Sequence, residues 1–141
     1  MMMNKKASYR VKAIAENIEK ALDPIMDVLE SIQIDHKICY KIRLALDELL
    51  TNVVSYAYDN HDGEMEIRYE IFEGDTRYII IDIIDEGKAF NPLEADDPDV
   101  TIDVSERKIG GLGLFIVKNT MDSLSYKREN NQNILTIKKI L

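Results

Sequence analysis

The sequence contains a single cysteine, Cys39, so no disulfide can form within the chain. Because disulfides are typical of oxidising compartments, their exclusion favours a reducing one. Cys39 lies in an apolar helical stretch, which indicates a small core residue and not a reactive thiol. The first ten residues lack the apolar core of a signal peptide, and no run of apolar residues approaches the length of a membrane helix. These absences predict a cytoplasmic protein with no membrane partner.

Basic residues are also in deficit, since 18 Lys and Arg stand against 26 Asp and Glu, for a formal net charge of −8. Nonspecific nucleic-acid binding needs a basic face that displaces counterions, so we expect no direct nucleic-acid partner. An anion such as ATP is not excluded, because backbone amides and Mg²⁺ can supply the positive field. The two histidines, His36 and His61, have no ligand-like spacing to each other or to Cys39. A zinc site is therefore not predicted.

The 141 residues are 45% hydrophobic and 31% charged, which fits one compact domain over residues 1–141. Alternating apolar residues and turn signals separate strands from helices. Strands are expected near 8–14, 65–71, 77–85, 124–129 and 133–141, and helices near 16–31, 36–58 and 112–123. Helices collected early and late, with hairpins between them, predict an α+β fold. We expect a two-layer sandwich with helices packed on one face of a mixed or antiparallel sheet.

Three local features sharpen this prediction. Pro24 should kink the first helix or split it into two. Asp35 is a good N-cap for the second helix. The β-branched segment 77–85, RYIIIDIID, has the composition of a central strand, and the polar segment 130–133 should be the turn of a C-terminal hairpin.

The second helix carries the first candidate site residues, Glu48 and Asn52. They stand four residues apart and so share one face of the helix. A carboxylate and a carboxamide at this spacing can hold a metal ion, or one can take a proton beside a metal held by the other. Alone, the pair is more typical of a solvated helix face than of a site.

A second candidate is Asp85, which ends the β-branched strand and is followed by Gly87 in a tight turn. Such an aspartate can accept a hydrogen bond from an exocyclic amine, and a neighbouring glycine lets a flat base approach the backbone. An ordinary Asp-Glu-Gly turn is the alternative.

The third candidate is the glycine-rich start of the last helix, KIGGLGLFIVKN, with glycines at 110, 111 and 113. Free amides and the helix dipole at such a start favour phosphate. The segment is not a Walker A loop, because the Gly-Lys-Ser/Thr ending is absent, and no strand directly precedes it as a Rossmann fingerprint requires. The alternative is a packing contact between small residues.

In this order and spacing, the three stretches resemble the Bergerat ATP-binding fold. That is the GHKL group, which includes histidine kinases, gyrase-type ATPases and anti-sigma-factor serine kinases. The small size and the segment from Ala89 to Lys139 are similar to the stand-alone bacterial serine-kinase branch, the anti-sigma regulators of partner-switching systems. No helix supplies a phosphoaccepting histidine, which disfavours a histidine-kinase fragment.

The resemblance implies a role for each candidate residue. Glu48 matches the general base and Asn52 the Mg²⁺ ligand, while Asp85 matches the reader of the adenine amino group with Gly87 making room beside it. Residues 94–108 would form a lid over the phosphates. The remaining nucleotide-binding candidates are Arg107, Gly110, Gly111, Leu112 and Gly113. Ala89, Ile109 and Asn133 depart from the commonest family pattern, which puts details of ATP affinity in doubt and not the fold.

The function that the resemblance implies is an ATP-dependent, Mg²⁺-dependent serine/threonine protein kinase and anti-sigma-type regulator. Its substrate would be a small STAS-type antagonist protein with a phosphorylatable Ser or Thr, a sigma factor would be a further partner, and a homodimer is compatible with it. The alternative is a nucleotide-gated binding module that sequesters a partner without phosphotransfer.

Overall fold

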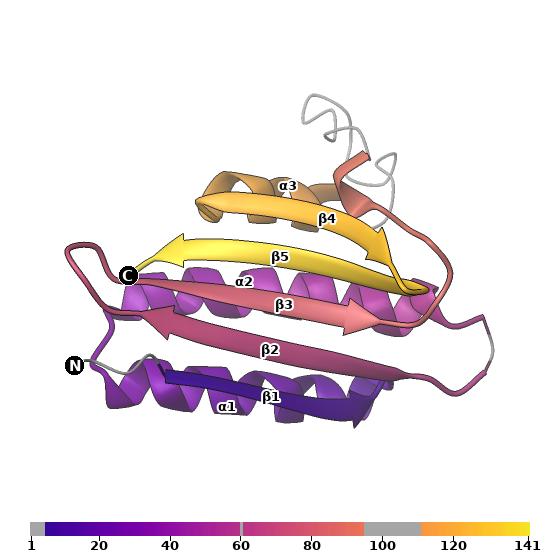
Figure 1. The fold of residues 1–141 in the computed structure, drawn as a ribbon, viewed down its shortest axis with the longest axis horizontal. Coiled ribbons are helices and arrows are strands. Elements are labelled where there is room, and N and C mark those ends of the chain that lie inside the picture. The colour runs from indigo at the N-terminus through magenta and orange to yellow at the C-terminus, as the bar shows by residue number, and fades with distance from the viewer. Residues whose placement is uncertain (1–4, 60, 95–110) are drawn as a thin grey trace.

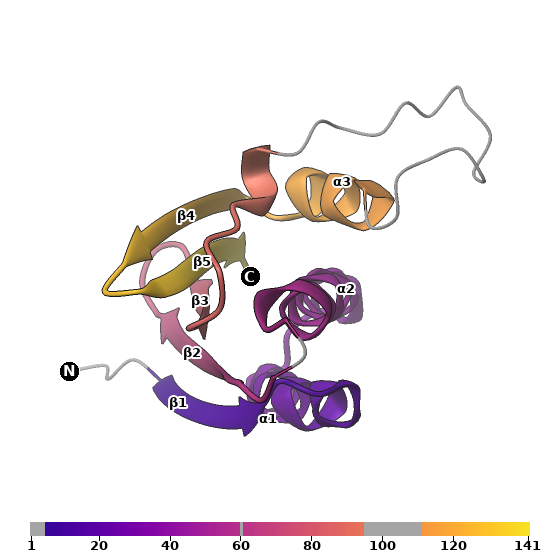
Figure 2. The ribbon, with the colours of Figure 1, turned by 90° about the vertical axis from the view of Figure 1, so that its right-hand side faces the viewer.

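The computed structural model of the protein describes residues 5–59, 61–94 and 111–141. In these residues a five-stranded antiparallel sheet, in the order β1-β2-β3-β5-β4, is covered on one face by three α-helices (Figures 1 and 2). The strands are β1 (Lys5–Lys12), β2 (Glu64–Phe72), β3 (Tyr78–Asp85), β4 (Ser123–Glu129) and β5 (Gln132–Ile140). The helices are α1 (Ile18–Ser31), α2 (His36–Asn52) and α3 (Gly111–Thr120), with short helical turns η1 (Ala15–Asn17), η2 (Val53–Ala57) and η3 (Pro92–Glu94). The predicted α+β sandwich is confirmed, with an antiparallel sheet.

Strand β3 is the centre of the sheet, as its β-branched composition predicted, and pairs with β2 and β5. Its side chains alternate between two faces. The face toward the helices carries the buried row Ile79, Ile81, Ile83 and Asp85. The first three residues of this row are apolar and the last is Asp85, so a carboxylate lies at the edge of the core.

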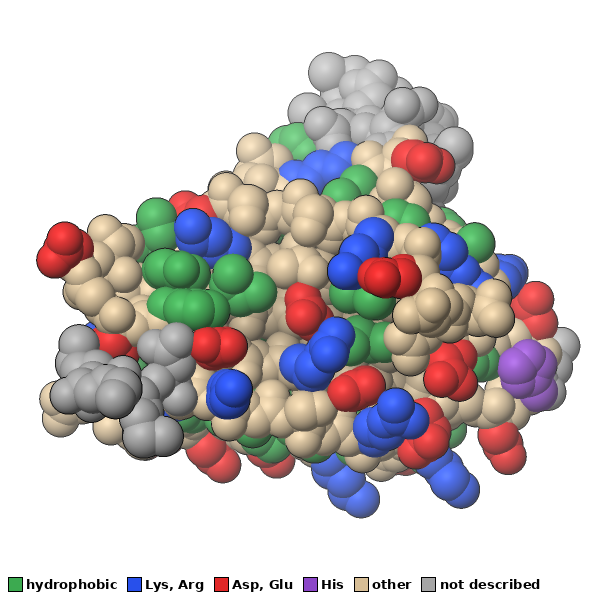
Figure 3. All heavy atoms as spheres, viewed as in Figure 1, with side chains coloured by type: hydrophobic (Ala, Val, Ile, Leu, Met, Phe, Trp, Pro, Cys, Tyr) green, Lys and Arg blue, Asp and Glu red, His purple; other side chains and the backbone are tan. Residues whose placement is uncertain are grey.

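The opposite face of the sheet is open to solvent and carries basic and acidic side chains interspersed (Figure 3). Cross-strand ion pairs join Arg10 to Glu66 at 3.4 Å and Arg68 to Asp82 at 3.8 Å. Exposed pairs of this kind contribute at most about 1 kcal/mol each. The free energy of folding therefore comes mainly from the helix-covered face, where the buried core lies.

Helix α2 begins as predicted, because the Asp35 carboxylate accepts a hydrogen bond of 2.7 Å from the Lys37 amide. Its buried face holds Ile42, Ala45, Leu46, Leu49 and Leu50. After Asn52 the helix continues as the single π-helical turn η2. Such widened turns inside helices are frequent at functional sites.

Helix α1 runs without interruption through Pro24, so the predicted division into two helices is wrong. A proline inside a helix costs about 3 kcal/mol. The same helix buries Leu22, Ile25 and Leu29 completely, and each such side chain contributes about 1.5–3 kcal/mol. Burial therefore outweighs the cost of the proline.

The C-terminal hairpin turns on two residues, Asn130 and Asn131, both with positive φ (53° and 62°). Two such residues in a row form the tight turn that matches strand twist. The predicted turn over 130–133 is thus too long. Gln132 and Asn133 belong to β5, and Asn133 pairs in register with Asp85 of β3.

Helix α3 also ends earlier than predicted, at Thr120, and Ser123 already opens β4. In the part of the chain that the structure describes, no helix has the length and apolar character needed to cross a membrane.

Candidate functional site

A mostly apolar pocket lies between the C-terminal end of α2 and the ends of β3 and β5. It is lined by Leu49, Asn52, Val53, Ala57, Ile83, Asp85, Phe90, Pro92, Tyr126, Asn133 and Leu135. Apolar walls with a few convergent polar groups are the usual make-up of a small-molecule site. Two of the polar residues, Asn52 and Asp85, are among those predicted from the sequence.

Asp85 is only 6% exposed. Its Oδ1 accepts two hydrogen bonds of 2.9 Å, one from the Gly87 amide and one from Asn133 Nδ2. Oδ2 accepts none from the described residues and remains available to a ligand. Burial raises the pKa of Asp85 above its ordinary value, while the two hydrogen bonds and the positive charge of Arg128 oppose the rise.

Asn133 is a site residue that the sequence analysis noted only as a departure from the family pattern. It is 6% exposed and lies beside Asp85 on the inward face of β5, next to Leu135 and Ile137. A polar residue at the end of a row of otherwise apolar, inward-facing side chains is the sequence feature that could have indicated this site residue. The structure also brings in Arg128 of β4, whose guanidinium donates to the Gly87 carbonyl at 2.7 Å.

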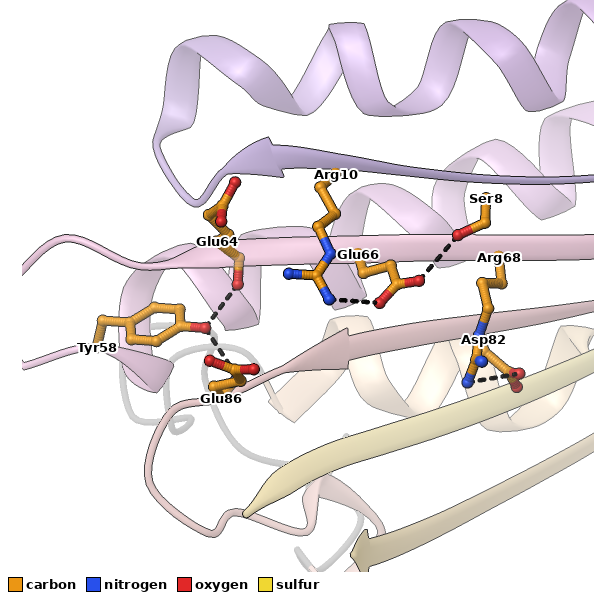
Figure 4. A network of polar contacts seen from close by, with 8 residues as sticks. All are labelled: Ser8, Arg10, Tyr58, Glu64, Glu66, Arg68, Asp82 and Glu86. Atoms are coloured by element: carbon orange, nitrogen blue, oxygen red, sulfur yellow. Dashed lines mark hydrogen bonds and ion pairs between the residues drawn. The ribbon is translucent and has the colours of Figure 1, made fainter. Parts of the chain in front are cut away.

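The turn after β3 is fastened to η2. The Tyr58 hydroxyl accepts a hydrogen bond from the Glu86 amide at 2.8 Å and donates one to the Glu64 carbonyl at 2.6 Å (Figure 4). The Lys88 amide donates to the Ala57 carbonyl at 3.0 Å. Asp85 is thereby held at a fixed position relative to the end of α2.

The structure gives a further reason for a glycine at position 87. A Cβ at this position would lie 2.2 Å from the carbonyl oxygen of Ala57, a backbone atom that cannot move aside easily. The missing side chain therefore lets the turn reach η2. Its predicted role in making room for a base remains a prediction.

Glu48 and Asn52 lie on α2 with polar atoms that lack partners. Glu48 Oε1 and Asn52 Nδ2 are buried and make no hydrogen bond with any residue that the structure describes. Burial raises the pKa of Glu48, and the negative charge of Asp47 adds to the rise. An unpaired buried polar atom costs about 1–3 kcal/mol. Groups kept in this state are candidates for binding a ligand or a proton.

Gly113 brings the first turn of α3 against Glu48. A Cβ on Gly113 would lie 2.1 Å from Glu48 Cδ and 2.2 Å from Oε2, so the helix can approach the carboxylate only because residue 113 has no side chain. The sequence candidates Glu48 and Gly113, 65 positions apart, therefore meet. The backbone of Gly111 and Leu112 opens α3, whereas Arg107, Gly110 and the predicted lid beyond Glu94 lie outside the described residues.

These residues fit a magnesium nucleotide. Asp85 offers a free carboxylate oxygen beside apolar walls that suit a flat base. The Asn52 side chain borders the pocket, and its Nδ2 has no hydrogen-bond partner among the described residues. A carboxamide oxygen is a ligand type that a hard cation accepts. Mg²⁺ usually keeps several waters and takes one or two protein ligands together with phosphates, so a larger protein cage is not required. The described residues contain no cluster of three acidic, His or Cys side chains that would form one.

The fold and this site define an ATPase domain of the histidine kinase-like class. The chain matches the family model described as histidine kinase-like ATPase domain over residues 11–139 and belongs to that family. The resemblance based on the three sequence stretches is thereby confirmed.

Two relatives show how similar the chain is to individual proteins. The chain is 30% identical over 98 residues to the serine/threonine-protein kinase BtrW of Bordetella bronchiseptica, covering 70% of this chain and 68% of that protein. It is also 30% identical over 109 residues to the serine-protein kinase RsbW of Halalkalibacterium halodurans, covering 71% of this chain and 61% of the relative. The matched region thus spans about two thirds or less of these relatives.

A solved structure shares the fold. The histidine kinase domain of the blue-light activated histidine kinase from Erythrobacter litoralis EL346 superposes with a TM-score of 0.53 at 17% identity. The superposition covers 86% of this chain and 60% of that one. At this identity the likeness shows the architecture.

Two glycine substitutions should separate the two ends of the site. Gly87→Ala meets the Ala57 backbone, so we expect a loss of roughly 1–3 kcal/mol in the free energy of unfolding. Gly113→Ala meets only the end of the Glu48 side chain, which can rotate away, and alanine is favoured in a helix by up to about 1 kcal/mol. We expect its stability in urea denaturation to be unchanged or raised. Equal destabilisation by both variants would contradict this assignment.

The buried carboxylate of Glu48 should also make stability depend on pH. Because its pKa is raised in the folded state, the folded chain holds this proton more tightly than the unfolded chain, and stability falls as pH rises through that pKa. Glu48→Gln should therefore be more stable than wild type at pH 7.5, and the difference should shrink as the pH is lowered toward the pKa of an ordinary glutamate. Urea denaturation at several pH values measures it. Glu30→Gln, at an exposed position of α1, is the control and should show no such trend.

Proposed function

We propose that this chain is an ATP-dependent protein serine/threonine kinase that acts as an anti-sigma-type regulator. Its substrate is a small antagonist protein with a phosphorylatable Ser or Thr, of the STAS type, and its other partner is a sigma factor or similar target. The catalytic unit is one domain over residues 1–141.

One observation carries this proposal: one oxygen of the Glu48 carboxylate, Oε1, is buried without a hydrogen-bond partner among the described residues, one helical turn from Asn52 and against the first turn of α3. A structural carboxylate would be hydrogen-bonded, as Asp85 is. A raised pKa suits a base that takes a proton from a hydroxyl. The names of the relatives, a serine-protein kinase and a serine/threonine-protein kinase, support this reading.

Each residue has one task in this proposal. Asp85 Oδ2 accepts a hydrogen bond from the adenine amino group, and Glu48 accepts the proton of the attacking hydroxyl. The first-turn amides of α3, at Gly111 to Gly113, face phosphate oxygens with the positive end of the helix dipole. Asn52 would hold Mg²⁺, which when bound supplies positive charge to the phosphates. Catalysis is then mainly positioning and charge stabilisation.

Phosphotransfer separates a kinase from a nucleotide-gated binder. Glu48→Gln keeps the volume and helix propensity of the side chain but cannot accept the proton as a carboxylate does. We expect single-turnover transfer to a STAS-type antagonist to fall by about 10²–10⁴-fold, while ATP affinity changes little. Asn52→Ala should weaken Mg-ATP binding itself, because it removes an oxygen ligand.

Two results would contradict the proposal. Unchanged transfer in Glu48→Gln removes Glu48 as the base. ATP binding by wild type without transfer to any of a panel of antagonists favours the module that sequesters a partner without phosphorylating it.

Recognition of the adenine base can be tested by comparing two substitutions on β3. Asp85→Asn should weaken ATP binding at least tenfold. The asparagine amide can place an N–H donor opposite the adenine amino group, and the substitution also removes the negative charge of the acceptor. Asp82→Asn changes an aspartate of the same strand on the solvent face and should leave ATP affinity unchanged. Calorimetric titration measures both. Equal affinities for the two variants would remove Asp85 from the site.

A further inference from the structure

Asn133 uses its whole side-chain amide inside the protein. Nδ2 donates to Asp85 Oδ1 at 2.9 Å and to the Lys88 carbonyl at 2.8 Å. Oδ1 accepts from the Phe90 amide at 3.3 Å and from the Tyr126 hydroxyl at 2.5 Å. An amide group has two donors and two acceptor positions, and all four are filled. Asn133 therefore has no capacity left for a ligand, although it borders the pocket.

The orientation of this amide is fixed by its neighbours. If the oxygen and nitrogen were exchanged, the oxygen would face two acceptors, Asp85 Oδ1 and the Lys88 carbonyl, and the nitrogen would face the Phe90 N–H donor. All three contacts would be repulsive. The network thus admits one arrangement, in which Asn133 always presents a donor to Asp85.

This arrangement decides what Asp85 can offer. With the Gly87 amide and Asn133 both on Oδ1, the other oxygen is the one left facing a ligand. A hydroxyl side chain at position 133 has a single proton and could donate either to Asp85 or to the Lys88 carbonyl. The amide donates to both, so it joins the strand end to the turn that follows.

We propose that Asn133 is a specificity-determining positioning residue, which fixes Asp85 as a pure acceptor and thereby selects a purine with an amino group at C6 over one with an oxo group at that position. The inference rests on the proposed nucleotide site and adds a residue to it. An acceptor opposite a carbonyl oxygen, as in guanine, is unpaired and repelled, so the discrimination depends on Asp85 staying ionised.

Several groups face Asp85 and set its ionisation. Burial raises its pKa, whereas Asn133, the Gly87 amide and Arg128 of β4 lower it. The other titratable groups nearby are Tyr58 after η2, Glu86 and Lys88 in the turn after β3, and Tyr126 of β4. Removing the Asn133 donor should raise the pKa of Asp85 further.

The test uses Asn133→Ala, Asn133→Thr and a matched control, Thr136→Val. Thr136 lies on the same strand and donates to Asp82 at 2.6 Å, so the control removes a hydrogen bond of the same kind on the other face of the sheet. The titration of the Asp85 carboxyl carbon is followed by NMR in the free protein, with Asp85→Asn identifying the signal. Affinities for Mg-ADP and Mg-GDP are measured calorimetrically between pH 5.5 and 8.

For Asn133→Ala we expect a higher Asp85 pKa, about tenfold weaker ADP binding at pH 7.5 and a smaller preference for ADP over GDP. Because protonated Asp85 is no longer a pure acceptor, ADP affinity should also begin to fall at a higher pH than in wild type. Asn133→Thr should be intermediate, since it keeps one donor, and Thr136→Val should match wild type. If Asn133→Ala does not fold, Asn133→Thr carries the same comparison.

If folded Asn133 variants have the same Asp85 pKa and the same preference for ADP as wild type, the inference is overturned and the proposed function is not affected. Wild type that binds neither ADP nor GDP would overturn it together with the proposed function. Preference for ADP that is lost equally in Thr136→Val would also overturn it, because the effect would then be one of general sheet stability.

Discussion

Burying a carboxylate at the end of an apolar row is the constraint around which this site is built. Asp85 follows Ile79, Ile81 and Ile83 on the inward face of β3, where an ionised group without hydrogen bonds would cost several kcal/mol. The Gly87 amide and Asn133 remove most of that cost. To do so, the turn after β3 must fold back, and the start of β5 must pair in register with the end of β3. The position of the pocket follows from these two requirements.

The carboxylate of Glu48 differs from that of Asp85 in its hydrogen bonding. Glu48 is half-buried beside Gly113, and its buried Oε1 has no partner among the described residues, so the cost of burying that oxygen is not offset. Burial raises the pKa of both groups, yet only Asp85 has its hydrogen bonds supplied by the protein. In our proposal this difference corresponds to two tasks, since a recognition group must be fixed whereas a base must be free to take a proton. The π-helical turn η2 begins directly after Asn52 and connects the two regions through Ala57.

Local pattern predicted the strands, the Asp35 cap and the position of Asp85 at the end of its strand, because alternation and capping depend on neighbours in sequence. The alternative that Pro24 divides the first helix into two was wrong, because the burial of one face of α1 outweighs the cost of the proline. The role of Asn133 was missed because the hairpin turn is two residues shorter than predicted, which moves Asn133 into the sheet opposite Asp85. The meeting of Glu48 with Gly113 depends on the packing of α2 on α3 and could be expected only from the family resemblance.

The central claim is that α2, the end of β3 and the start of α3 form a single nucleotide site. The most direct measurement is a titration of the ¹⁵N-labelled chain with Mg-ADP, followed through its amide signals. The account predicts the largest shifts at Asn52, Gly87 and Gly113, saturating together with one dissociation constant. Shifts confined to the solvent face of the sheet, or separate saturation of the two ends of the pocket, would contradict it.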